Sequence, residues 1–215
     1  AARASGIVPR MGLSRALRRA RVALSPGGRA HLRLHRSIEG QLAVEESRFL
    51  RRAASGRRTI VEIGSYRGKS AAMLALGSAP DGRVTAIDPH IRSAGAGVTA
   101  YAADDERVFR ETMERLGVAD RVHHIVKTSA DARPDWPDGE PIDLLWIDGD
   151  HSHEGVRRDL SDWAGLVTPG GLIALHDYTH KEGVRRAWDE FIAERGKDWT
   201  ARGTVRSIVH ATRAG

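Results

Sequence analysis

Five short apolar runs, separated by helix-like segments, constrain the fold of this chain more than any other feature. The runs are TIVEIG (59–64), RVTAID (83–88), RVHHIV (121–126), IDLLWID (142–148) and GGLIALHD (170–177). Helices are predicted around them at 37–54, 69–78, 101–117, 154–167 and 181–195, and a β hairpin at 198–212. Strands that alternate with helices predict a doubly wound α/β domain, with helices on both faces of a mostly parallel sheet.

Two connections and one core residue follow from local composition. The segment 89–100 is rich in glycine, alanine and serine and is predicted to be a loop. The residues Thr168-Pro169-Gly170-Gly171 are predicted to stop the helix before the last parallel strand. Trp146 alternates with Leu145 and Ile147 in an apolar run, which indicates a core position.

Charged side chains stand at the ends of these predicted strands, where a structural core does not need them. Glu62 and Asp88 come at the ends of the first two runs, and Asp148, His176 and Asp177 at the ends of the last two. In doubly wound sheets, ligands bind beyond the carboxyl ends of the strands, where the strand order reverses. The pattern therefore predicts one chemical site at that edge of the sheet.

Composition limits the kinds of chemistry and the number of domains. At 215 residues the chain predicts one domain, 37–215, with a basic arm, 1–36, that carries nine arginines and no acid. Because the net charge is +6, removing the arm leaves the rest mildly acidic, so nucleic acid is not the expected partner. An arm of this kind could pack on its own domain or on a second copy in a homodimer. The absence of cysteine excludes thiolate chemistry, and with no membrane-length apolar stretch a cytoplasmic protein is expected.

The loop EIGSYRGKS (62–70) follows the first predicted strand and is expected to meet a ligand. Its glycines, Gly64 and Gly68, do not match the G-x-G-x-x-G pattern of dinucleotide enzymes, and the loop lacks the four-residue lead of a P-loop. It is therefore less suited to a pyrophosphate. Asp88, at the end of the second run, is an acid that can accept both hydroxyls of a ribose.

Three stretches together resemble a known family: IVEIGSYRGKSAAMLAL, VTAIDPH, and DLLWIDGDHSHEGVRRDL with PGGLIALHDY. They resemble class I S-adenosylmethionine-dependent methyltransferases, and among these the metal-dependent small-molecule and sugar O-methyltransferases of the macrocin and mycinamicin type. The resemblance covers roughly Ile38 to Tyr178. It implies a Rossmann-like sheet of seven strands that ends in an antiparallel hairpin.

The resemblance also implies where S-adenosylmethionine binds. Its methionine end would be lined by Glu62, Gly64 and Gly68. Asp88 would hold the ribose, and Ser129 or Asp131 would border the adenine. Asp148 would be either a metal ligand or a contact to the methionine amino group. The full set of cofactor-binding residues that it implies is Glu62, Gly64, Ser65, Gly68, Ser70, Asp88, Ser129, Asp131 and Asp148.

Methyl transfer to an alcohol needs alignment of the acceptor oxygen and removal of its proton, and a divalent metal with a nearby base can do both. The resemblance implies Asp148, His176 and Asp177 as ligands of Mg²⁺ or Mn²⁺ and His151 as the base. Asp150 is the alternative base, or a carboxylate that orients His151. The chain has His176-Asp177 where the sugar enzymes have two acids, so either His176 is not a ligand, or the metal preference differs, or no metal binds.

The other histidines have plainer interpretations. His153 is expected at the start of a helix, facing solvent or capping it, and His90 is expected beside the adenosine. At least one of His123 and His124 is expected to pack inside a strand.

The acceptor is predicted least directly. A sugar hydroxyl, as in a mannose-type saccharide or a glycosylated natural product, and a catechol can each offer two adjacent oxygens to one metal. The resemblance favours the sugar, and the arginine-, alanine- and glycine-rich composition is typical of actinobacteria. An RNA methyltransferase that uses the basic arm is the alternative, against which the acidic main body argues. A metal phosphohydrolase, a nicotinamide dehydrogenase and a non-catalytic binding module are less favoured.

Overall fold

The computed structural model describes residues 25–90, 104–137 and 139–215. Two compact units divide the chain, residues 1–37 and 38–215. In the first, helix α2 (Pro26–Arg36) begins after Ser25, whose hydroxyl accepts a hydrogen bond from the Gly28 N–H at 3.0 Å. The predictions for residues 1–24 of the basic arm, including its packing on a partner, lie outside the described residues. In the described part of the chain, none of the helices has the length and hydropathy needed to span a bilayer.

The second unit contains a seven-stranded sheet in the order β3-β2-β1-β4-β5-β7-β6. The neighbours from β3 to β5 are parallel, and β7 is antiparallel to both β5 and β6. The strands are β1 (Thr59–Ile63), β2 (Arg83–Ile87), β3 (Val122–Ile125), β4 (Ile142–Ile147), β5 (Val167–Leu175), β6 (Trp199–Val205) and β7 (Ile208–Arg213). The predicted α/β class and the antiparallel C-terminal hairpin are confirmed.

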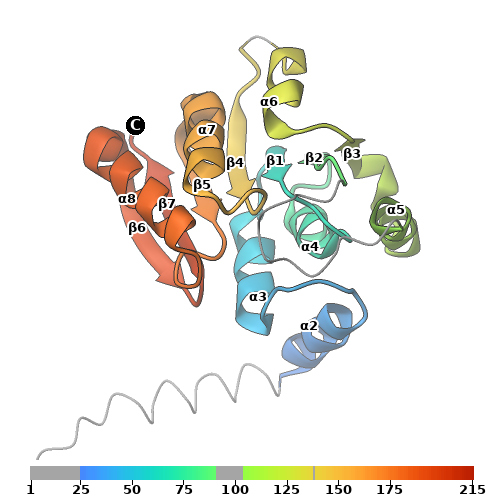
Figure 1. Ribbon diagram of the computed structural model, residues 1–215. Coiled ribbons are helices and arrows are strands. Elements are labelled where there is room, and N and C mark those ends of the chain that lie inside the picture. The colour runs from blue at the N-terminus through green and yellow to red at the C-terminus, as the bar shows by residue number, and fades with distance from the viewer. Residues whose placement is uncertain (1–24, 91–103, 138) are drawn as a thin grey trace, which may run out of the picture. The chain divides into compact units, whose positions relative to one another are not determined.

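Helices cover both faces of this sheet (Figure 1). On one face lie α3 (Val44–Ala53), α4 (Lys69–Gly77) and α5 (Asp105–Arg115). On the other lie α6 (Ser129–Ala132), α7 (His153–Trp163) and α8 (Glu182–Arg195). Short 3-10 turns lie at 119–121, 133–135, 164–166 and 196–198.

Burial explains why the central elements have their sequences. Strand β4 is almost wholly buried, and Trp146 within it is 0 % exposed, as predicted. Helix α4 begins with a run of small residues, from Ser70 to Ala72, and its buried face lets it lie close to the sheet. On the opposite face, Trp163 of α7 and Trp188 of α8 pack into the same core as β4.

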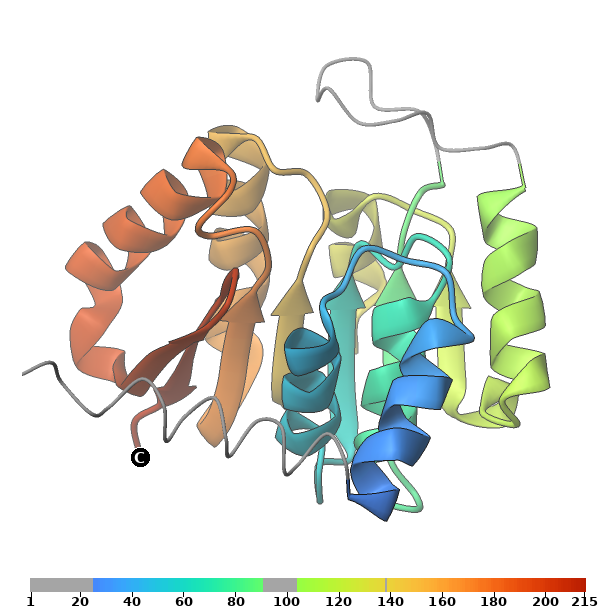
Figure 2. The same ribbon diagram turned by 90° about the horizontal axis from the view of Figure 1, so that it is seen from below.

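The strand order reverses between β1 and β4, and this places the site. The arrowheads of the parallel strands point to one edge of the sheet in Figure 2. At that edge, Gly64 follows β1 with φ +84°, and a Cβ built on it would lie 2.3 Å from the Asp148 carbonyl oxygen. A side chain there would push the two loops apart. Gly64 therefore holds the end of β1 directly against the loop after β4.

Two predictions about local structure were wrong. The helix expected from residue 37 begins at Val44, because Glu46 accepts a hydrogen bond from the Ala43 N–H and fixes the start of α3 there. The strand predicted from Gly170 begins earlier, at Val167, so Thr168 and Pro169, which were predicted to stop the preceding helix, lie inside β5. Ile142 of β4 pairs with Val167, but Leu144 already pairs with Leu172, so residues 168–171 of β5 form a bulge. A proline, which has no N–H, is tolerated in such a bulge. Residues 91–103, which hold most of the predicted loop, lie outside the described residues.

Candidate active site

A cavity of about 480 Å³ opens at the carboxyl edge, over the ends of β1, β2, β4 and β5. Ten of the predicted site residues line it: Gly64, Ser65, Ser70, Asp88, Ser129, Asp148, Asp150, His151, His176 and Asp177. The lining also contains residues that the sequence did not single out, among them Lys69, Asp159 and Lys181. The predicted convergence of charged strand ends on one place is therefore observed.

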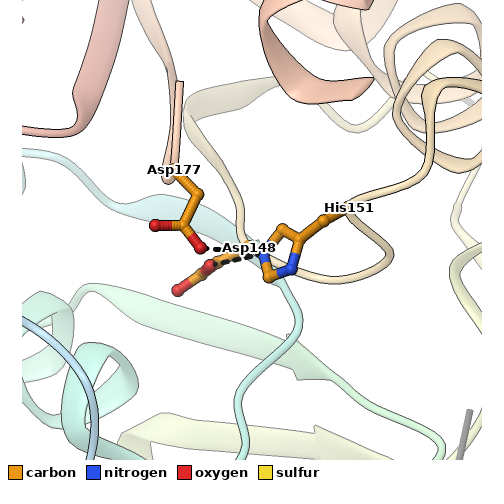
Figure 3. Close-up of side chains that lie close together, drawn as sticks. All are labelled: Asp148, His151 and Asp177. Carbon is orange, nitrogen blue, oxygen red and sulfur yellow. Dashed lines mark hydrogen bonds and ion pairs between the residues drawn. The ribbon is translucent and has the colours of Figure 1, made fainter. Parts of the chain in front are cut away.

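Asp148, His151 and Asp177 form a compact group at one end of this cavity (Figure 3). The His151 Nε2 lies 3.3 Å from Asp148 Oδ1 and 3.6 Å from Asp177 Oδ2. One ligand atom from each of the three residues lies within 4.8 Å of the others. About a fifth of each side chain is exposed, so the group is open to a ligand in the cavity.

His176 lies behind this group, between two carboxylates. Its Nδ1 is 3.2 Å from Asp148 Oδ1, and its Nε2 is 3.3 Å from Glu46 Oε2. Glu46 belongs to α3 and is itself fixed, because it accepts hydrogen bonds from the Ser207 N–H at 3.0 Å and the Ser207 hydroxyl at 2.6 Å. Both ring nitrogens of His176 thus face acids, as they would in an imidazolium that donates two hydrogen bonds.

The charges of these residues support one another. Burial alone would lower the pKa of His176, but Asp148 and Glu46 raise it to about 11. Burial would raise the pKa of Glu46, but His176 and Ser207 lower it to about 2. The pKa of His151 is also set by opposing effects. Burial lowers it, and Asp148 and Asp177 raise it above the ordinary value.

Asp177 reaches the cavity through an unusual backbone conformation. Its φ is +58°, in the left-handed region that residues other than glycine seldom occupy. The strand ends just before it, and the N–H groups of His180 and Lys181 donate to the Asp177 carbonyl. Such conformations persist where surrounding structure holds them, and they are frequent at functional sites.

Asp150 points to the start of α7 rather than to His151. It accepts hydrogen bonds from the Ser152 N–H at 2.8 Å and the Ser152 hydroxyl at 2.9 Å. A Cβ on Gly155 would lie 2.4 Å from Asp150 Oδ2, so this carboxylate packs directly on the first turn of the helix. Its placement fits a role in shaping the loop, and its role as alternative base stays a prediction.

The Asp88 carboxylate is held by the loop after β1. Its Oδ2 accepts the N–H groups of Ser65 and Tyr66, each at 2.8 Å, and its Oδ1 accepts the N–H of His90 at 2.8 Å. These bonds fix the carboxylate beside the cavity and leave lone pairs on Oδ1 for a ligand hydroxyl. Asp88 is thus both the support of the loop and the predicted ribose contact.

Glu62 lies under the cavity rather than in its lining. It is fully buried, and within the described part of the chain neither of its side-chain oxygens has a hydrogen-bond partner. Burial raises the pKa of Glu62 well above its usual value, the nearby Ser70 hydroxyl lowers it, and Asp148 and Asp88 raise it further.

The far end of the cavity has a second buried acid, Asp159 of α7. The Ser129 hydroxyl donates to it, and the residue is 3 % exposed. Burial raises the pKa of Asp159 to about 7, more than the Ser129 hydrogen bond lowers it. Asp131, the alternative to Ser129, is exposed, does not line the cavity, and accepts a hydrogen bond from the Thr128 hydroxyl.

Gly68 also lies outside the cavity lining. It is the N-cap of α4 with φ +87°, and a Cβ there would lie 2.6 Å from Met113 Cε. The positive φ and the packing on α5 explain why a glycine is needed at position 68. The roles of Gly68, Glu62 and Asp131 toward a cofactor stay predictions.

His90, His124 and His153 pair with protein groups. His90 does not line the cavity, and its Nε2 lies 2.9 Å from the His124 Nε2. His124 stacks on Phe109, with ring centroids 4.2 Å apart, whereas His123 is exposed. His153 Nε2 lies 2.7 Å from Glu190 Oε2, so it links α7 to α8.

Sequence reasoning missed Glu46, Lys69 and Asp159. Glu46 and Asp159 lie inside helical segments, where an acid is ordinarily taken as a solvated side chain, and no nearby signal marks them as buried. Lys69 stands within the loop EIGSYRGKS, between two residues that the resemblance did mark. Its position next to a glycine turn at a helix start was the available signal.

The chain is similar to known proteins. A family model described as a methyltransferase domain matches residues 61–178, which is more than half of the chain. A catechol O-methyltransferase of Mycobacterium tuberculosis is 29% identical over 161 residues, 69% of this chain and 66% of that protein. The chain thus spans slightly less than two thirds of this curated relative's length.

Solved structures of methyltransferases share the fold. The O-methyltransferase TomG from Streptomyces achromogenes, involved in tomaymycin synthesis and solved with SAM, has a TM-score of 0.64 at 19% identity, covering 93% of this chain and 96% of that one. An O-methyltransferase from Bacillus cereus in complex with SAH has a TM-score of 0.61 at 19% identity, covering 86% of this chain and 90% of that one.

Proposed function

The chain belongs to the family of methyltransferase domains, and on this premise we propose that it transfers a methyl group from S-adenosylmethionine to a hydroxyl of a small polyhydroxylated acceptor. The observation that carries the proposal is the group of Asp148, His151 and Asp177 at one end of the cavity. The predicted membership in the class I methyltransferases is confirmed by the family match and the sheet order. The acceptor, the base and the metal go beyond these findings.

The residues present fit S-adenosylmethionine. The cavity of about 480 Å³ is within the usual size range of small-molecule sites. Asp88 lies where a ribose hydroxyl can donate to it, and the buried Ser65 hydroxyl has no partner within the described part of the chain. When bound, S-adenosylmethionine supplies an electrophilic methyl group on a sulfonium. The O-methyltransferase TomG, which has a similar fold, was solved in complex with SAM.

His151 is the proposed general base. Its Nε2 takes the proton of the acceptor hydroxyl while the new oxygen–methyl bond forms and the sulfur–methyl bond breaks, which leaves S-adenosylhomocysteine and an imidazolium. Asp148 and Asp177 lie 3.3 and 3.6 Å from this nitrogen and stabilise the positive charge that it acquires. Their effect raises the pKa of His151 and makes it a stronger base than a free imidazole.

A divalent metal is the second part of the proposal. Asp148 and Asp177 supply the hard oxygen ligands that Mg²⁺ or Mn²⁺ prefers, and they belong to a group whose ligand atoms lie within 4.8 Å of one another. A bound metal would position the acceptor hydroxyl and lower its pKa. His176, the third ligand predicted from sequence, would have to give up its contact with Asp148 or Glu46, because a nitrogen bound to a metal carries no proton.

A sugar is the proposed acceptor, and a catechol is the second candidate. The acidic and imidazole groups at the reactive end suit an acceptor with adjacent hydroxyls, which both classes have. The resemblance to sugar O-methyltransferases favours a saccharide, such as a mannose-type oligosaccharide. The likeness to the mycobacterial catechol O-methyltransferase is the observation that keeps the catechol in consideration.

The test is methyl transfer from S-adenosylmethionine to panels of saccharides and catechols, each with and without a chelator. Methylation of a saccharide is the expected result, and turnover of catechols alone would replace the sugar by the second candidate. Full activity after metal stripping would remove the metal from the mechanism. Failure of S-adenosylhomocysteine to bind in calorimetry would contradict the methyltransferase proposal itself.

His151→Ala tests the base, and His153→Ala is its matched control. Removal of a general base lowers kcat by roughly 10²- to 10⁴-fold and removes the acid limb of the pH–rate profile. His153 lies two residues away, pairs with Glu190 and does not line the cavity, so its removal is expected to leave kcat within about twofold. Equal effects of the two substitutions would contradict the assignment of His151.

A further inference from the structure

The first turn of helix α8 lies directly against the loop that carries His151. Gly183 is the second residue of that helix, and a Cβ built on it would lie 2.4 Å from the His151 carbonyl oxygen and 2.7 Å from the His153 backbone nitrogen. Both distances are far shorter than the roughly 3.5 Å at which non-bonded atoms pack. Because the two contacted atoms belong to the backbone, neither can rotate away. With a side chain at position 183, the helix and the loop would have to separate by about 1 Å.

The backbone conformation of Gly183 does not require a glycine. Gly64 and Gly68 have positive φ angles, but Gly183 lies inside an α-helix and its φ is not positive. A glycine inside a helix destabilises it relative to an alanine. The close approach of α8 to the loop is therefore the physical reason that remains for a glycine at this position.

The same end of α8 is also fixed to Asp177. The Asp177 carbonyl accepts the N–H groups of His180 at 2.9 Å and Lys181 at 2.8 Å, and Lys181 is the N-cap of α8. The Lys181 carbonyl in turn accepts the N–H of Arg185 at 3.1 Å. The connection from Asp177 into the helix is thus a hydrogen-bonded turn, so a movement of the helix start would also move Asp177.

Core packing holds the first turn of α8 in place. Val184, the residue after Gly183, is 2 % exposed and lies in the same apolar core as Trp163 and Trp188. Close-packed interiors resist displacement, so α8 cannot easily move away from the loop. The loop itself is half-buried or exposed along residues 149–153. A side chain at position 183 would therefore displace the loop, and with it His151, rather than the helix.

His151 and Asp177 come from different parts of the chain, after β4 and after β5, yet their side chains meet at 3.6 Å (Figure 3). The first turn of α8 contacts the backbone of both. We propose that Gly183 is a positioning residue for methyl transfer, because it lets this turn set the distance between His151 and Asp177. The inference rests on the proposed function, in which His151 removes the acceptor proton. Gly183 does not line the cavity, so it acts through His151.

Gly183→Ala tests the inference through steady-state kinetics. A misplacement of a reacting group by about 1 Å can cost a factor of about 10², so kcat is expected to fall by roughly 10- to 100-fold. The KM for S-adenosylmethionine and the calorimetric affinity for S-adenosylhomocysteine are expected to stay within about twofold. The reason is that the predicted nucleoside contacts, Asp88 and Ser129, follow other strands, β2 and β3.

Gly77→Ala is the matched control. Gly77 ends α4, its φ is not positive, and a Cβ there would lie 2.2 Å from the Arg51 carbonyl oxygen. The two substitutions therefore force a helix away from a backbone carbonyl to a similar extent, but Gly77 lies outside the cavity lining. Gly77→Ala is expected to lower the melting temperature and to leave kcat within about twofold.

A second variant covers the case in which Gly183→Ala does not fold. Val184→Ala loosens the same turn of α8 without a clash, because it removes apolar atoms from the core. It is expected to lower kcat by roughly three- to tenfold, again with little change in the KM for S-adenosylmethionine.

A double-mutant cycle separates positioning of the base from a general structural effect. If Gly183 acts through His151, adding Gly183→Ala to His151→Ala should change kcat by less than about twofold, although it lowers kcat strongly in the wild type. Gly77→Ala should have the same small effect in both backgrounds.

Three results would overturn the inference. Reductions in kcat that multiply in the double variant would show an effect independent of His151. Parallel losses of kcat and of S-adenosylhomocysteine affinity would show a distorted cavity. An unchanged kcat in Gly183→Ala or, if that variant does not fold, in Val184→Ala would show that the turn does not position the base. If the wild-type protein transfers no methyl group, the proposed function fails and this inference fails with it, whereas an active wild type with any of the three results overturns the inference alone.

Discussion

The two buried cations of the cavity, His176 and Lys69, have opposite surroundings. His176 lies between Asp148 and Glu46, at 3.2 and 3.3 Å, and these acids raise its pKa to about 11. Lys69 is buried to a similar extent, but a carbonyl is its partner and its pKa is lowered. One charge is compensated by the protein, and the other is not.

The difference separates a structural role from a binding role. The imidazolium of His176 connects α3, through Glu46, with the end of β4, and Ser207 links the turn of the terminal hairpin to the same carboxylate. A group with its partners in place stabilises the folded state, whereas an uncompensated buried charge destabilises it. Binding sites often keep such costs because the ligand supplies the missing partner.

Removal of the compensated cation is expected to have the largest effect. His176→Ala leaves the buried Glu46 and the partly buried Asp148 without their shared cation, which should lower the free energy of unfolding by about 3–5 kcal/mol. Urea denaturation at neutral pH measures it. Adding Glu46→Gln in the double variant should recover part of the loss, because it neutralises one of the two acids.

His151→Ala is the matched control for this comparison. Its side chain is 20 % exposed, and Asp148 keeps His176 as a partner when it is removed. Its loss should cost under about 1 kcal/mol, because the ion pair is partly exposed and Asp148 is not left alone. An equally large loss of stability in both variants would contradict the special role of His176.

The pH dependence of stability gives a second, smaller test of the same pair. Glu46 has a pKa of about 2 when folded, below its ordinary 4.5, so its contribution is present above pH 4.5 and is lost as the pH falls toward 2. His176 has a raised pKa of about 11, so its contribution is complete below pH 6.5 and is lost as the pH rises toward 11. The pair therefore contributes most between pH 4.5 and 6.5.

Glu46→Gln should reduce the acid-induced loss of stability by up to about 2 kcal/mol, measured as the change in unfolding free energy between roughly pH 6 and pH 3. The substitution keeps an acceptor for Ser207, so the hairpin turn stays attached. An acid limb as steep as that of the wild type would mean that Glu46 is not held ionised by His176.

The fold was predictable because its signals are local. Each parallel strand is a short apolar run, each connection has a helical period or a turn, and the family motifs fix the order. The exception at Thr168–Gly171 has a physical cause. Proline and glycine ordinarily end strands, but a bulge beside Ile142 of β4 accommodates them inside β5.

The site was predictable only where function and strand ends coincide. Asp88, Asp148 and Asp177 follow strands, and the topology alone brings them to one edge. The environment of His176 was not predictable, because its partner Glu46 is 130 residues away in sequence and lies in an ordinary amphipathic helix. Local spacing contains no information about which helix residue meets a strand end from the other side of the sheet.

Removal of the uncompensated cation, Lys69, is expected to have the smallest effect. The direction of the change in unfolding free energy tests the comparison with His176. Lys69→Met replaces a desolvated ammonium by an apolar side chain of similar length, so the ligand-free protein should gain about 1 kcal/mol of unfolding free energy. Thermal melts with and without S-adenosylhomocysteine measure it: the variant should melt higher alone and be stabilised less by the ligand. A destabilised ligand-free variant would mean that Lys69 already has compensation within the protein, and the contrast with His176 would then fail.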